Sequence, residues 1–340
     1  MKRPIRDTVF LSDYTRPEAE HVLAAMLSIA PDDGNPHHPS KGFALSVRDH
    51  LLQHPEIALS CLPASTPTAL NRSLSQPHKA RQAMQLLVLM PYLSGDLDGD
   101  AIGRVEAYAE ELHLHPDSLK DLKLIGEKRL KKALFDYGRR ALNAFFPGNA
   151  LQQLAASLRE VHTMLGDRQQ LARYLALEHQ PQGSLGRTIH TFYNDRGFHF
   201  PGERGNLGEF AVRHDCVHIL CGANTDMKGE IAVGGVEAGM ARTPYGWEML
   251  AEVIIDFHMG IAWSLPPGIA PGTMNFDPEM VSQGLAMGAA MHCDLLSDWN
   301  FWDDIETPLL ELRQRFGING VSIIDMPAPG NHPNAASVYW

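Results

Sequence analysis

The sequence predicts a mainly α-helical protein in which a multi-helix domain follows a smaller helical domain. Apolar residues recur at helical spacing in most segments; in one of them they are Ile102, Val105, Tyr108, Ala109 and Leu112. Runs of alternating apolar and polar residues, which would predict strands, are sparse. With 340 residues, of which 44% are hydrophobic and 20% charged, the chain can bury a sizeable core.

Residues 1–78 are predicted to form an N-terminal helical segment and a linker. A helix from Arg16 to Ile29 ends at the breaker-rich stretch PDDGNPHHPSKG, and a second short helix fits residues 43–52. Prolines and serines punctuate residues 60–78, so this part is the predicted linker.

Residues 79–144 are predicted to form a small helical bundle. A strongly apolar helix over 79–93 precedes the turn SGDLDGD (94–100), and further helices lead into the basic sequence EKRLKKALFDYGRRAL (127–142). This order of an apolar helix, an Asp/Gly turn and a further helix resembles the TerB-like helical bundle of tellurite-resistance proteins.

Residues 145–320 form the predicted main domain, and 321–340 an extended tail. Helices are expected at 150–165, 167–178, 209–221, 244–263, 277–298 and 305–316. Residues 180–208 hold six glycines and two prolines and are expected to be irregular. Gly284 and Gly288 give one helix a face of small residues, and their spacing leaves open whether this face packs within the chain or across a homodimer.

Charge and cysteine content exclude several classes of protein. The formal net charge of −11 argues against a nucleic-acid partner, because binding phosphates needs a surplus of Lys and Arg. The four cysteines form no C-x-x-C pair and predict no disulfide framework. The N-terminus lacks the apolar run of a secretory signal, and no stretch approaches the roughly 20 apolar residues of a membrane-spanning helix. A cytoplasmic protein without a transmembrane segment is therefore predicted.

Four residues form a candidate site for a divalent metal. In RHDCVHILCG (213–222), His218 lies about 40° around the helix from His214, and Asp215 about 100°. Glu230 follows after a turn that can return a carboxylate to the same face. Imidazole and carboxylate donors suit zinc, iron(II), manganese or magnesium. The spacing leaves two roles open for Asp215, which is either a fourth ligand or a general base beside a three-ligand ion.

The same motif carries a resemblance to a known family. H-D-x-x-H, followed by eleven residues and Glu, resembles the metal signature of the coenzyme Q (ubiquinone) biosynthesis protein 4 family. GSLGRTIHTFYNDRGFHFPG (183–202) resembles the segment that leads into that signature, and DWNFWDDIETPLLELRQRFGI (298–318) resembles the family's closing segment. The resemblance covers about residues 145–320 and leaves out the first 140 or so.

This resemblance implies a helical domain that holds a divalent ion, zinc first, through His214, Asp215, His218 and Glu230, which are then also the catalytic residues. It further implies oxidative decarboxylation of a prenylated benzoate, in which a hydroxyl replaces the C1 carboxylate, and work at the inner face of the membrane beside other enzymes of quinone biosynthesis. One alternative is a non-catalytic scaffold that binds prenyl lipids. Another is an HD-type phosphohydrolase, which would need a further upstream His and a distant Asp.

The segment RTPYGWEMLAEVIIDFHMG (242–260) offers further polar groups. Glu248 and Glu252 share one helical face, and Asp256 and His258 follow them. Metal-bound imidazoles commonly donate their second nitrogen to a carboxylate, which this helix could supply. An amphipathic helix with a solvated acidic edge explains the same pattern.

Overall fold

A computed structural model describes residues 9–31, 34–35, 37–63, 65–95, 97–145, 166–204, 208–265 and 269–318. The prediction of a mainly α-helical fold is confirmed, since these residues contain fourteen α-helices and no β-strand. The helices of the first half are α1 (Arg16–Ile29), α2 (Pro39–Val47), α3 (Pro67–Ser73), α4 (Pro77–Leu89), α5 (Gly99–Leu112), α6 (Asp117–Gly126) and α7 (Leu130–Phe145). Those of the second half are α9 (Arg168–Leu175), α10 (Leu185–Arg196), α11 (Glu209–Cys221), α12 (Met227–Met240), α13 (Tyr245–Phe257), α14 (Pro278–Ala290) and α15 (Leu309–Phe316).

The predicted linker over 60–78 contains a helix, α3, and so that prediction is wrong in part. Pro67 occupies the first turn of α3, and the hydroxyl of Thr66 accepts a hydrogen bond from the Ala69 amide, which caps the helix. Proline and hydroxyl residues are breakers inside a helix but favour its N-terminus. The composition that predicts a linker is therefore also the composition of a helix start.

Residues 180–208 also contain a helix that the glycine count conceals. The side chain of Ser184 caps the start of α10, and Gly197 ends the helix in the left-handed conformation, at φ 67°. Glycine is the preferred residue at that position. The expected helices over 244–263 and 277–298 are shorter in the structure, where α13 and α14 end at Phe257 and Ala290. The predicted helix over 150–165 and the tail after 320 lie outside the described residues.

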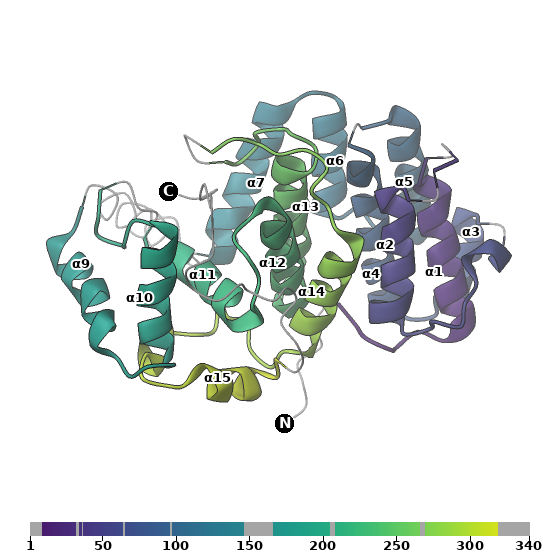
Figure 1. Cartoon of the computed structure of the whole chain (residues 1–340). Coiled ribbons are helices and arrows are strands. Elements are labelled where there is room, and N and C mark those ends of the chain that lie inside the picture. Colours follow the sequence, from purple (N-terminus) through teal and green to yellow (C-terminus); the bar gives the residue numbers. More distant parts are fainter. Residues whose placement is uncertain are drawn as a thin grey trace.

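Two hydrophobic cores hold the helices together. The first joins α1–α7 to α13 and α14, and the second joins α9–α11 and α15 to one side of α12. Figure 1 shows α12, α13 and α14 in the middle of the molecule, between the N-terminal helices and α9 and α10. Residues 79–144 thus share their core with helices from the second half of the chain. No helix within the described residues is long and apolar enough to cross a membrane.

Glycines allow α12 and α14 to lie in direct backbone contact. A Cβ atom on Gly288 would stand 2.0 Å from the carbonyl oxygen of Val236, and one on Gly284 would stand 2.5 Å from that of Ala232. From the other side, a Cβ on Gly239 would approach the backbone of α14 in the same way. The face of small residues on α14 therefore packs within the chain, and its partner, α12, carries Glu230.

Candidate metal centre

The structure brings three of the four predicted ligands together. His214 and His218 lie one turn apart on α11, and Glu230 lies in the first turn of α12. The Nε2 atoms of the two histidines are 3.1 Å apart, and they lie 3.1 Å (His214) and 3.2 Å (His218) from Oε2 of Glu230. These donor atoms can together hold a metal ion.

The Nδ1 atom of each imidazole is held by a hydrogen bond to an oxygen acceptor. Nδ1 of His218 lies 3.3 Å from the carbonyl oxygen of Ala223, which follows the end of α11. Nδ1 of His214 lies 2.8 Å from Oε1 of Glu237, two turns after Glu230 on α12. A proton held at Nδ1 leaves the lone pair of Nε2 free for an ion, as in metal-binding histidines generally.

The spacing of the donors fits a first-row divalent ion. Donors about 2.1 Å from such an ion lie about 3.0 Å apart at a right angle and about 3.4 Å apart at the tetrahedral angle. The observed separations of 3.1 and 3.2 Å fall between these values. In addition, Oε1 of the fully buried Glu230 has no hydrogen-bond partner, which is costly for a carboxylate unless an ion or another group satisfies it. The donor set is therefore suited to a metal.

The protein surroundings keep the site charged. Burial opposes ionisation of Glu230, but the imidazoles of His218 and His214 outweigh it and lower the pKa of the carboxyl to about 2. Burial likewise opposes a charge on His214, yet the carboxylates of Glu237 and Glu230 raise the pKa of its imidazole well above the ordinary value. A metal ion would take the place of the protons that this cluster otherwise holds.

Asp215 takes a different position from the other three residues. It is buried, its Oδ2 accepts a hydrogen bond of 2.5 Å from the Tyr193 hydroxyl of α10, and it is not among the residues whose donor atoms converge. Burial raises the pKa of its carboxyl. Ligation by Asp215 stays a prediction, and the three-ligand alternative matches the convergence of donor atoms.

None of the family models, curated proteins and solved structures compared with the chain matches it. The likeness to the ubiquinone-biosynthesis family thus stands on the quoted motifs. In the structure the three motifs are neighbours, because α10 and α15, from the first and last motif, both pack against α11, which carries the His-Asp motif. The amides of Leu185 and Gly186, at the start of α10, donate to the carbonyls of Thr307 and Ile305 just before α15.

The sequence did not predict the partners of the two imidazoles. The carboxylate beside His214 belongs to Glu237, which lies seven residues after Glu230 and therefore on nearly the same face of α12. That spacing would have revealed it if α12 had been predicted. Tyr193 leaves no such signal, because it reaches Asp215 from a separate helix.

The polar residues of α13 serve other contacts than the predicted ones. Glu248 accepts from Arg140, and Glu252 from the Tyr137 hydroxyl, so both hold α7. Asp256 accepts from the Trp263 and Ser264 amides. His258 contacts the Leu93 carbonyl and the Phe276 amide. Glu248 and Glu252 therefore join α13 to α7, whereas Asp256 and His258 hold the segment that follows α13.

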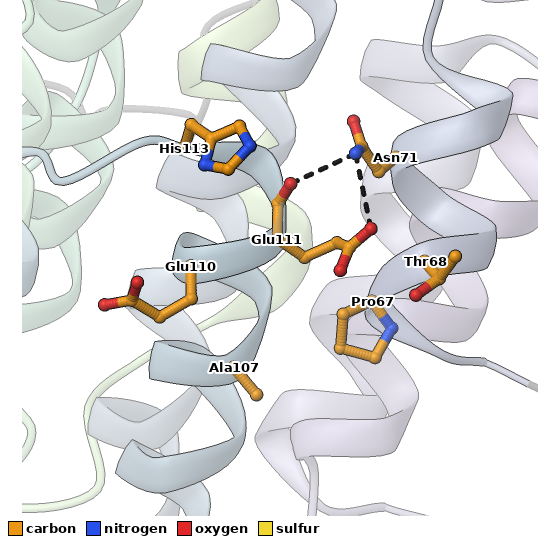
Figure 2. Close-up of a pocket in the computed structure, with 7 residues that line it drawn as sticks. All are labelled: Pro67, Thr68, Asn71, Ala107, Glu110, Glu111 and His113. Carbon is orange, nitrogen blue, oxygen red and sulfur yellow. Dashed lines mark hydrogen bonds between the residues drawn. The ribbon is translucent and has the colours of Figure 1, made fainter.

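A separate hollow of about 390 Å³ lies between α3 and α5 (Figure 2). Asn71 reaches across its edge and donates to the backbone carbonyl and the carboxylate of Glu111, as the dashed lines in Figure 2 show. These hydrogen bonds between Asn71 and Glu111 connect α3 to α5. The converging donors of the metal centre have no counterpart among the residues that line this hollow.

Proposed function

We propose that His214, His218 and Glu230 bind a divalent metal ion, zinc in the first place, in a metal-dependent enzyme of ubiquinone or related prenylated-aromatic metabolism. The observation that carries this proposal is the convergence of two Nε2 atoms and Oε2 of Glu230, with the second carboxylate oxygen buried and without a partner. The packing of two resembling segments, those of α10 and α15, against the third, which contains α11, supports it.

The donor set favours an anionic ligand. Two neutral imidazoles and one carboxylate leave a divalent ion with a net positive charge, which attracts a carboxylate or phenolate. Such an ion supplies Lewis-acid stabilisation of negative charge on the substrate. The chain itself contributes orientation, because Glu237 and the Ala223 carbonyl fix the two imidazoles and the Tyr193 hydroxyl fixes Asp215.

The reaction we propose exchanges the C1 carboxylate of a prenylated benzoate for a hydroxyl. This exchange is an oxidation: the carboxylate leaves as CO2, and one atom of dioxygen, with a proton from solvent, becomes the ring hydroxyl. The other oxygen atom leaves as water after taking up two electrons and two protons from a reductant. Dioxygen and the reductant are co-substrates that come from outside the chain. Because the prenylated ring dissolves in lipid, we also propose that the protein works at the membrane surface beside other enzymes of the pathway.

Metal analysis of the purified chain, followed by an assay on a prenylated hydroxybenzoate, tests the proposal. One ion per chain is expected. His218→Ala should lose both the ion and turnover, because it removes a fully buried donor. His199→Ala is the control, since His199 is exposed, pairs with Glu203 and is not among the converging donors. An active protein that contains no metal would refute the proposal. Metal and co-purified prenyl lipid without turnover would favour the scaffold alternative.

A further inference from the structure

The outer face of α7 combines exposed apolar side chains with exposed cations. Phe135 is 75% exposed, Leu142 41% and Leu134 39%. Lys131, Phe135 and Leu142 are spaced by four and seven residues, and they therefore follow one stripe along the helix. A protein rarely leaves such a group of large apolar residues in water without a function.

The inner face of α7 fixes the helix on the protein. Ala133 and Tyr137 are buried, the Tyr137 hydroxyl donates to Glu252, and Arg140 donates to Glu248 at 2.6 Å. Figure 1 shows α7 beside α6 and α13, against which it packs. The exposed stripe is thus presented outward by a helix whose other side is anchored.

The charge of this segment is opposite to that of the whole chain. Residues 127–143 hold six basic and two acidic residues, whereas the chain carries a net charge of −11. The acidic residue within α7, Asp136, already pairs with Lys120 and Arg139. Lys131 and Lys132 are exposed beside the apolar side chains. A negatively charged surface would therefore attract the protein through α7 and repel most of the remaining surface.

We propose that the outer face of α7 docks on a bilayer that contains anionic phospholipids. Phe and Leu side chains bordered by lysines are typical of helices that lie in the membrane interface, where lysine stems reach lipid head groups. Lysine is depleted in protein–protein interfaces. A second copy of the chain would place the same cations against each other.

The outer face of α7 is the surface through which the protein would reach the membrane location of the proposed function. Its role in the cell rests on that proposal, but its binding to lipid does not. The metal centre lies on α11 and α12, and α7 contributes no ligand. His218→Ala should consequently bind vesicles as the unaltered chain does. Failure of one proposal can therefore be told from failure of the other.

Sedimentation with vesicles tests the docking surface. The full chain should bind vesicles of phosphatidylcholine and phosphatidylglycerol in equal parts, and should bind pure phosphatidylcholine much less. Raising the salt concentration should weaken binding. Phe135→Glu should reduce partitioning by on the order of tenfold or more. Lys131→Gln and Lys132→Gln should each reduce it about fivefold.

Leu310→Glu is the matched control, because Leu310 is 68% exposed on α15, away from α7, and the exchange adds the same charge. Its binding should equal that of the unaltered chain. Equal losses in Phe135→Glu and Leu310→Glu would overturn the proposal, as would no binding to the anionic vesicles. A third outcome is that the unaltered chain does not bind vesicles but forms a dimer, which Phe135→Glu dissociates. The outer face of α7 would then be an interface between copies, and the proposal would be wrong.

Discussion

Replacing Gly288 with alanine tests the contact between α12 and α14. The added Cβ would stand 2.0 Å from the Val236 carbonyl oxygen and 2.7 Å from the Met240 amide nitrogen. Ordinary contacts begin near 3.4 Å, so the helices would have to separate locally by about 1.4 Å. All of the nearest atoms belong to the backbone of α12, which cannot rotate away as a side chain can.

Two effects of opposite sign decide the magnitude. Overpacking costs about 1–3 kcal/mol, while alanine gains about 1 kcal/mol over glycine in helix propensity. Since the clash is with backbone, we expect the overpacking cost to lie near the top of its range. Gly288→Ala should then lower the free energy of unfolding by about 1–2 kcal/mol. Because α12 carries Glu230, metal affinity should fall as well.

Urea denaturation followed by circular dichroism measures the change, and titration with zinc measures the affinity. Gly103→Ala is the matched control: Gly103 lies within α5, and a Cβ there meets no atom within 4 Å. It should raise the free energy of unfolding by about 0.5–1 kcal/mol. If Gly288→Ala stabilised the protein as Gly103→Ala does, the close approach of the helices would be refuted.

Three further substitutions probe the surroundings of the site and the first core. Glu237→Gln should weaken metal binding by about 10- to 100-fold, because it removes the charge behind the His214 imidazole, a proposed ligand; equal affinity by calorimetry would contradict this role. Tyr193→Phe should lower the free energy of unfolding by about 1–3 kcal/mol, because it leaves buried Asp215 without its donor; an unchanged urea midpoint would show that the bond contributes nothing. Burial raises the pKa of Glu248 to about 7, although Arg140 opposes the shift. The folded state therefore holds this proton more tightly than the unfolded state, and stability should fall as the pH rises from about 4.5 to 7. Glu248→Gln should flatten that decline in urea midpoints measured across this pH range, and an identical pH profile would count against the shift.

The sequence predicted which side chains lie close together on one helix, but mostly not which side chains meet between helices. The spacing of His214 and His218 alone places both imidazoles on one face of α11. Glu230 could be added because a motif joined it to them. The helix that carries Glu230 was not predicted, since four glycines lower its helix propensity. Tertiary packing explains them: Gly235 and Gly239 lie against α14, Gly234 lies against α13, and Gly229 lies against the backbone of Asn224.

Contacts between side chains of different helices were harder to predict from the sequence. The pairing of Tyr193 with Asp215 depends on how α10 packs on α11, which no local pattern records. Glu248 was a reasonable partner for a metal-bound imidazole by type, but α13 faces the first core, where the Glu248 carboxyl accepts a hydrogen bond from Arg140. The residue types limited which side chains could be partners of the site residues, and the tertiary packing decided which of them make contact.

The membership of α12 in both cores ties the metal centre to distant parts of the chain. Ile231 and Ala238 pack in the first core, whereas Val233 and Val236 pack in the second. On the side of the first core, α13 and α14 pack directly on α12, so opening them would expose one side of the helix that holds Glu230. Amide hydrogen exchange should find α12, α13 and α14 in one cooperative unfolding unit, whose opening slows when the ion is bound.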